Sequence, residues 1–305
     1  MRPTLFFWTE FLDLNILKRI ISKLGSYNIG LNLAITPKRL SKITPIVKEC
    51  EYNNVILNFW PLLSKKQGYW VNAWNLDVQA KWIDYLLKNF PTINDFLLDL
   101  EKPINFRGIK GKIMLSKFKK IVPETLVKEK LNSIVDNVHD HNKKVVSTSY
   151  GGIPLGLQPR PSNADYYSYM VYLSFILRIS DINTREDIIF YCAHKIRKAH
   201  GKKKAAIDLG LTSAGVLGEG FMNFLGFLDL HELSRQIEIC LFAGLKRIQI
   251  FSLDNFAQSI EKVLEKITSL KPRKPPLFFP EKKSGFMLKA YRKVLFPRDR
   301  DLSKF

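Results

Sequence analysis

Short apolar segments alternate along the chain with longer segments in which apolar residues recur at helical spacing. Residues 14–25, 80–90 and 256–267 are examples of the longer kind. Eight such pairs of segments can be counted, and their alternation predicts repeated βα units with a parallel sheet. The predicted strands are residues 4–8, 28–34, 54–60, 95–101, 144–150, 167–173, 204–211 and 247–253.

Eight βα units that close on themselves form a (β/α)8 TIM barrel, and we predict this α/β fold for residues 1–270. An open, doubly wound sheet is the alternative. The first predicted strand is not followed by either glycine-rich nucleotide motif, GxGxxG or GxxxxGK[ST]. A phosphate-binding barrel also stays open, because the glycine-rich residues 210–220 follow the seventh strand.

Polar residues interrupt the apolar strands near their carboxyl ends. Active sites of TIM barrels are built at this end, from side chains of several strands. The sequence therefore predicts one shared site. Besides the fourth strand, its predicted contributors are Glu10, Asn32, Asn58, Trp60, Ser147, Ser149, Tyr172, Asp208 and Asp254.

Asp99 and Glu101 stand at the end of the fourth predicted strand, which is otherwise apolar after its first residue. Side chains at i and i+2 of a strand point the same way, so both carboxyls should face the barrel interior above Leu97, with Leu98 and Leu100 facing the helices. One ionised carboxyl raises the pKa of its neighbour, which keeps a proton donor available near neutral pH. Cleavage of a glycosidic bond needs such a donor. Ion pairs with nearby lysines or loop backbone are the alternative interpretation.

Four aromatic residues lie in the segment after the third strand, outside any helical or strand period. Two interpretations stay open for this segment. On an exposed loop, the rings would stack on the apolar faces of sugar rings, which makes Trp60, Trp70 and Trp74 candidate substrate-binding residues. Packed inward, they and Tyr69 would close the top of the barrel or cover a helix.

Three short motifs resemble those of glycoside hydrolase family 18, which contains chitinases and endo-N-acetylglucosaminidases. The D-x-E of residues 99–101 is similar to the catalytic signature of the fourth strand in that family, and to that of family 25 lysozymes. Met170 and Tyr172 look like the Met-x-Tyr of its sixth strand. Residues 250–255 look like its eighth strand, with Phe251 in place of the usual Trp.

The resemblance implies an enzyme that hydrolyses a β-linked, N-acetylated glycan. Glu101 would donate the proton, Asp99 would orient and polarise the N-acetyl group, and Tyr172 would hydrogen-bond the same group. Met170 would line the substrate site. The chain departs from family 18 at Leu97, where that family has another Asp.

Composition and segment lengths indicate which broad class of protein the chain belongs to. The chain has 305 residues, 46% of them hydrophobic, as in ordinary globular proteins. No segment reaches the roughly 18 apolar residues of a membrane span, and residues 1–8 do not look like a secretion signal. Cys50, Cys192 and Cys240 are far apart and lack metal-binding spacing. We therefore expect a cytoplasmic protein with buried free thiols and no metal or cofactor.

The basic character of the chain is concentrated at its C-terminal end. The net charge is +20, and residues 271–305 hold eleven Lys or Arg against three acidic residues, a net charge of +8. Prolines at 272, 275 and 276 end the last predicted helix, so we predict a separate tail whose deletion leaves the barrel folded. Two alternatives to a hydrolase stay open: a non-catalytic glycan-binding barrel, and a scaffold that binds nucleic acid or an anionic surface through the tail.

Overall fold

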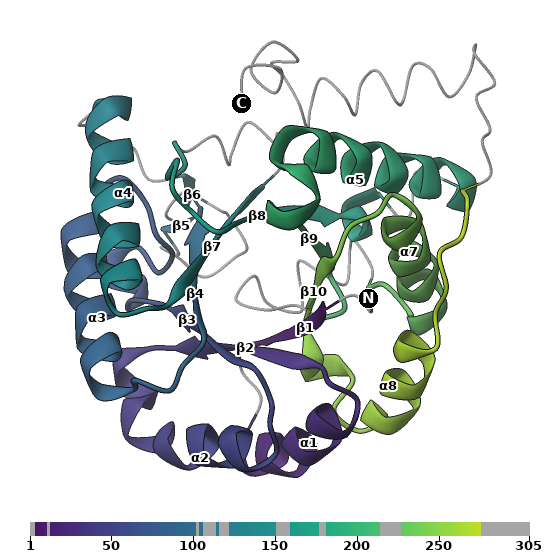
Figure 1. Cartoon of the computed structure of the whole chain (residues 1–305), viewed down its shortest axis with the longest axis horizontal. Coiled ribbons are helices and arrows are strands. Elements are labelled where there is room, and N and C mark those ends of the chain that lie inside the picture. Colours follow the sequence, from purple (N-terminus) through teal and green to yellow (C-terminus); the bar gives the residue numbers. More distant parts are fainter. Residues whose placement is uncertain are drawn as a thin grey trace.

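The structure is a closed barrel of eight parallel strands with helices on its outside (Figure 1). It is a computed structural model that describes residues 4–10, 13–101, 104–105, 114–115, 122–150, 159–176, 181–213 and 227–275. The strands follow one another around the barrel in the order β1-β10-β9-β8-β7-β4-β3-β2. The predicted (β/α)8 barrel is confirmed.

Each of the eight predicted strands corresponds to a strand of the barrel. The ladder closes where β1 pairs with β10, with Thr4 beside Arg247 and Trp8 beside Phe251. A separate antiparallel pair, β5 (Ile104–Asn105) and β6 (Met114–Leu115), lies outside the barrel sheet. The barrel strands are β1 (Thr4–Thr9), β2 (Gly30–Ile35), β3 (Leu57–Pro61), β4 (Asp95–Leu100), β7 (Lys144–Tyr150), β8 (Tyr166–Tyr172), β9 (Ala205–Gly210) and β10 (Arg247–Phe251).

The helices turn apolar faces toward the strands. In α1, Asp13 caps the amino end by accepting hydrogen bonds from the backbone N–H groups of Asn15 and Ile16, and Leu17 and Leu24 are buried. Between β7 and β8 the described residues 159–165 form no helix, although one was expected after each strand. The described α-helices are α1 (Leu14–Ser26), α2 (Thr44–Tyr52), α3 (Leu76–Asn89), α4 (Glu124–Asp140), α5 (Ile182–Lys204), α7 (Leu230–Phe242) and α8 (Ile260–Thr268).

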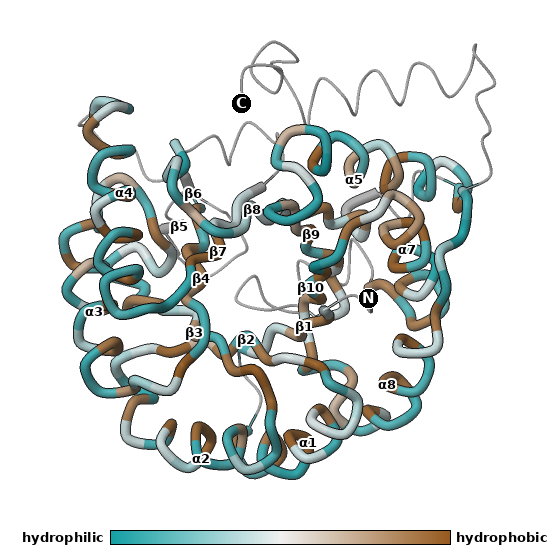
Figure 2. Tube along the Cα trace, viewed as in Figure 1, coloured by the Kyte–Doolittle hydropathy of each residue, from teal (hydrophilic) through white to brown (hydrophobic). Residues whose placement is uncertain are grey.

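Two apolar layers form the core, one between helices and strands and one inside the barrel. Figure 2 shows hydrophobic residues along the barrel strands and, alternating with hydrophilic ones, along the surrounding helices. Alternation along β4 assigns its residues to these layers. Leu98 and Leu100 belong to the outer layer and Leu97 belongs to the inner one. The side of β4 that carries Leu97 therefore faces the barrel interior, as predicted.

An ion pair fills the amino-terminal end of the barrel interior. Arg247, the first residue of β10, donates from Nη2 to Oδ2 of Asp95, the first residue of β4, at 2.9 Å. The guanidinium lies 4.2 Å from the ring centroid of Phe6 and 4.3 Å from that of Tyr166. Both partners are buried. Burying both charges is costly, so the pair stabilises the barrel little relative to apolar residues, whereas losing one partner leaves the other charge buried and uncompensated.

The three cysteines are buried and unpaired, as expected.

In the part of the chain that the structure describes, no helix is both long enough and apolar enough to cross a bilayer.

Removal of residues 276–305 is expected to leave the melting temperature within about 4 °C of that of the full chain. The barrel closes between β1 and β10, and α8 packs on α1 and α7, all before residue 276. Cutting after Pro275 also keeps the hydrogen bond from the Arg273 N–H to the Glu238 carbonyl, at 3.1 Å. Calorimetry of the two proteins tests this. A melting temperature more than about 10 °C lower would show that residues 276–305 complete the core.

Candidate active site

The two carboxyls of the D-x-E motif lie at the carboxyl end of β4. Asp99 is buried and Glu101 is partly exposed. The segment after β3 extends the sheet here, because the Val71 N–H donates to the Asp99 carbonyl at 3.0 Å and the Glu101 N–H donates to the Val71 carbonyl at 3.2 Å. These backbone bonds fix the end of β4, so that Glu101 stands at the mouth of the barrel and Asp99 one level deeper.

Both carboxyls have a raised pKa. Burial is the main cause for each. The pKa of Glu101 rises to about 8, with the charge of Glu10 as the second cause. The pKa of Asp99 is raised well above its usual range by burial and then by the charges of Glu101, Asp208 and Glu10. The charge of Glu101 raises the pKa of Asp99, as expected for neighbouring acids, whereas the charge that raises the pKa of Glu101 belongs to Glu10 and not to Asp99.

Glu10 follows β1 and is held in place from two sides. The Tyr69 hydroxyl donates to its Oε1, and Arg39 donates to its backbone carbonyl. Burial, reinforced by the Glu10 charge, raises the pKa of Tyr69, and burial lowers the pKa of Arg39. Glu10 is 3% exposed, so its charge acts on Glu101 with little screening by water.

Asp254 joins the ends of β1 and β10 at the same face of the barrel. Its carboxylate accepts from the Thr9 hydroxyl at 3.0 Å and from the Ser252 hydroxyl at 2.6 Å. The backbone N–H of Glu10 also lies 3.4 Å from its Oδ2. The structure thus brings Asp254 and Glu10 together, while contact of either residue with a substrate stays a prediction.

The aromatic residues at the end of β3 and in the segment after it are mainly buried. Trp60 is 2% exposed and Trp70 is 4% exposed, whereas Trp74 is 42% exposed. The ring of Trp60 meets Trp8 edge to face at a centroid distance of 4.8 Å, and Tyr69 meets Trp70 at 5.3 Å. The exposed-loop interpretation is wrong for Trp60 and Trp70, because both fill the inner layer. Only Trp74 presents a substantially exposed ring, and a role of any of the three in substrate binding stays a prediction.

Met170 and Tyr172 of β8 also face the barrel interior. Both belong to the inner apolar layer together with Phe251, whose ring centroid lies 6.2 Å from that of Tyr172. Met170 pairs in register with Asp208 of β9. Met170, Tyr172 and Phe251, from the motifs on the sixth and eighth strands, therefore share one interior layer with Leu97 of β4.

Asn58 lies deeper in the barrel than the mouth. Its side-chain amide donates to Asn32 Oδ1 at 2.9 Å, and the Asn32 amide donates in turn to Gln249 Oε1 at 2.6 Å. All three are fully buried. This chain of amides links β3, β2 and β10 across the interior, and the sequence did not indicate Gln249 as a member.

Ser147 and Ser149 were expected at the site, and the register places them elsewhere. They pair with Leu98 and Leu100 of β4, whose side chains lie in the outer layer. Thr148 pairs with Asp99 and is the β7 residue on the inward side. The Ser149 hydroxyl instead accepts a hydrogen bond from Arg160.

Nothing in the described ranges resembles a metal centre, since no group of three or more His, Cys, Asp or Glu side chains has suitable geometry.

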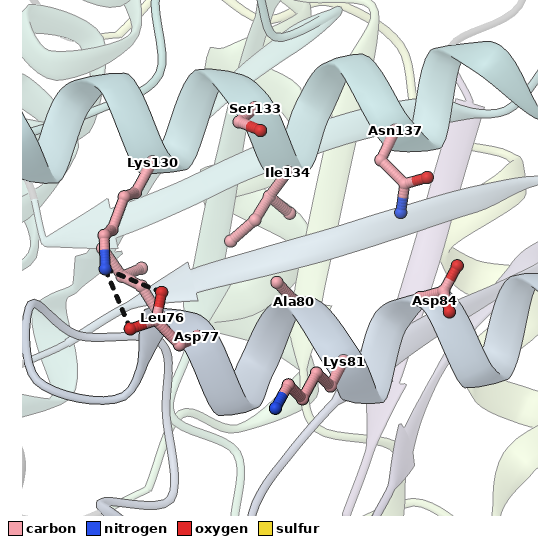
Figure 3. A pocket seen from close by; sticks show the side chains of 9 residues that line it. All are labelled: Leu76, Asp77, Ala80, Lys81, Asp84, Lys130, Ser133, Ile134 and Asn137. Carbon is pink, nitrogen blue, oxygen red and sulfur yellow. Dashed lines mark hydrogen bonds and ion pairs between the residues drawn. The ribbon is translucent and has the colours of Figure 1, made fainter.

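A separate groove of about 360 Å³ lies between α3 and α4, where Lys130 Nζ donates to both carboxylate oxygens of Asp77 at 2.7 and 2.8 Å (Figure 3). It is on the outside of the barrel and contains none of the predicted site residues. Most of the glycine-rich segment 210–220 lies outside the described residues.

The fold is similar to that of solved glycoside hydrolase barrels. The PgaB (BpsB) glycoside hydrolase domain from Bordetella bronchiseptica has a TM-score of 0.60 and 12% identity, over 89% of this chain and 100% of that one. GH5_18 from Bifidobacterium longum subsp. longum has a TM-score of 0.59 and 9% identity, over 90% and 82%. GH5_18 from Streptomyces cattleya, solved in complex with GlcNAc, has a TM-score of 0.56 and 9% identity, over 89% and 82%.

At such low identity these similarities establish the barrel fold. They do not single out family 18 or family 25, whose motifs the sequence resembles. No family model and no curated protein matches the sequence.

Proposed function

We propose that this protein is a glycoside hydrolase that cleaves a β-linked, N-acetylated glycan, with Glu101 as the general acid. One arrangement carries the proposal: Glu101, a partly exposed residue at the mouth of the barrel, stands one level above the buried Asp99, and burial of its carboxyl with the nearby charge of Glu10 raises its pKa to about 8. Such a group is protonated at neutral pH and within reach of solvent and substrate. The similarity of the fold to glycoside hydrolases, one of them solved with GlcNAc, supports the proposal.

Each member of the site has a role in this proposal. Glu101 donates its proton to the glycosidic oxygen as the bond breaks. Asp99, one level deeper, orients and polarises the N-acetyl group, and Tyr172 hydrogen-bonds the same group from β8. The proposed substrate-contacting residues are Glu10, Asn58, Trp60, Trp70, Trp74, Met170 and Asp254.

Turnover by the wild-type protein tests the proposal. We expect release of the fluorophore from β-linked N-acetylglucosamine oligomers that carry a fluorogenic leaving group, and no release from the matching α-linked compounds. Binding without turnover would support the non-catalytic glycan-binding barrel instead. The described residues add no observation in favour of a nucleic-acid or anionic-surface partner, and residues 276–305 lie outside them.

We expect Glu10 to set the pH at which activity declines on the alkaline side. Its charge raises the pKa of Glu101, and a general acid works only while protonated, so activity of the wild type should decline as pH rises through about 8. Glu10→Gln removes that charge, which lowers the pKa of Glu101 and moves the alkaline limb of kcat/KM to lower pH. Glu261→Gln, on the outer face of α8 and paired with Lys23, is the matched control and should leave the limb in place. A limb that stays at the wild-type pH in Glu10→Gln would contradict this assignment.

A further inference from the structure

Asp208 is a buried carboxyl for which the proposed reaction gives no clear task. It lies on β9, faces the barrel interior and is fully buried. The Trp8 indole N–H donates to its Oδ1 at 3.0 Å. Its Oδ2 has no hydrogen-bond partner within the described chain, and the same is true of Oδ1 of Asp99. Buried polar atoms of this kind are normally satisfied by a proton or by ordered water.

The groups around the two carboxyls differ in charge. Besides burial, the charges of Glu101, Asp208 and Glu10 raise the pKa of Asp99, and the Trp60 indole lowers it. Three like charges make ionisation of Asp99 costly in a buried site.

Asp208 is surrounded by groups that favour its ionised form. Trp8 and Ser168 lie beside it, and the positive charges of Arg247 and Arg160 act on it. These groups partly offset burial, so that the pKa of Asp208 rises only to about 7. Of the two carboxyls, Asp208 is the one with a hydrogen-bond donor at 3.0 Å and positive charges nearby, whereas acids act on Asp99, so the negative charge is more favourable on Asp208.

We propose that Asp208 is a positioning residue of the site: anchored by Trp8, it carries the negative charge of the barrel interior, and this charge keeps a proton on Asp99. Asp208 acts through Asp99 and does not itself touch the substrate. The proton on Asp99 is a property of the free protein. Only its consequence for turnover rests on the proposed function.

A protonated Asp99 changes what the site can offer a ligand. A carboxylic acid kept neutral by its surroundings can donate a hydrogen bond, which a carboxylate cannot do. Asp99 would then donate to the carbonyl oxygen of an N-acetyl group. A neutral Asp99 also adds no like charge beside Glu101, in agreement with Glu10 being the charge that raises the pKa of Glu101.

Carboxyl titration by NMR of protein labelled with ¹³C at its aspartate side chains tests the proposal without any substrate. The Asp99 signal is assigned by its loss in Asp99→Asn. In Asp208→Asn, which keeps an oxygen for the Trp8 N–H, we expect the Asp99 midpoint to fall by about one pH unit or more. Trp8→Phe is expected to lower it as well, because an Asp208 without its donor ionises less readily.

The matched control is Asp84→Asn on the outside of α3, where Asp84 pairs with Lys88. It should leave the Asp99 midpoint unchanged. If Asp208→Asn does not fold, Trp8→Phe decides alone, since it retains a ring against Trp60. An Asp99 midpoint that stays at the wild-type pH in the folded variants overturns the proposal. That result would leave the hydrolase assignment standing, and absence of hydrolysis would leave the titration result standing.

Discussion

Glu101→Gln is expected to lower hydrolysis of a β-linked N-acetylglucosamine oligomer by about 10²–10⁴-fold, the usual contribution of a general acid. The amide keeps the shape of the side chain at the end of β4 but supplies no proton to the leaving oxygen. Because Glu101 is partly exposed and its backbone N–H is bonded to the Val71 carbonyl, the fold should be unaffected. Fluorophore release measures turnover, and calorimetry with the unmodified oligomer measures binding, which should stay nearly intact.

Two further variants make this experiment specific. Asp99→Ala should also impair turnover, through loss of the group that orients the N-acetyl moiety. Glu261→Gln makes the same carboxyl-to-amide change on the exposed face of α8 and should retain full activity. Undiminished turnover by Glu101→Gln would remove Glu101 from the mechanism.

Asp95→Ala is expected to destabilise the protein by about 3–5 kcal/mol, the cost of leaving one partner of a buried ion pair uncompensated. Arg247 would remain in the barrel interior between Phe6 and Tyr166 without the carboxylate that it contacts at 2.9 Å. Unfolding in urea, followed by tryptophan fluorescence, measures the change in the free energy of unfolding.

The control for this variant breaks an exposed pair. Glu261→Ala removes the partner of Lys23 at the surface and should cost no more than about 1 kcal/mol. Combining Asp95→Leu with Arg247→Met, which replaces both charges by apolar groups, should recover much of the lost stability. An Asp95→Ala protein as stable as Glu261→Ala would show that Arg247 does not need Asp95 to compensate its buried charge.

The fold was predictable because every strand has a local signal. Most barrel strands are short apolar runs, and segments of helical period separate most of them. In β4, alternation correctly placed Leu97 inside and Leu98 outside. In β7, alternation gave the wrong side, because polar residues occupy both sides of KVVSTSY. The pairing of Thr148 with Asp99 shows that Thr148 is the inward residue.

The site was only partly predictable, since its decisive contacts join residues far apart in the chain. The bond from Trp8 to Asp208 spans 200 positions, and that from Tyr69 to Glu10 spans 59. No spacing rule indicates either. The contact between Arg247 and Asp95 had a weak sequence signal. The two residues carry opposite charges and stand at the first positions of two predicted strands, which places them at the same end of the barrel.

A crystal structure of Glu101→Gln with a bound N-acetylglucosamine oligomer tests the central claim most directly. The account predicts a glycan across the carboxyl ends of the strands, with the glycosidic oxygen about 2.6–3.2 Å from the amide at position 101. An N-acetyl group should then lie between Asp99 and Tyr172. A glycan bound only on the outside of the barrel, or one whose glycosidic oxygens all lie beyond reach of position 101, would contradict the account.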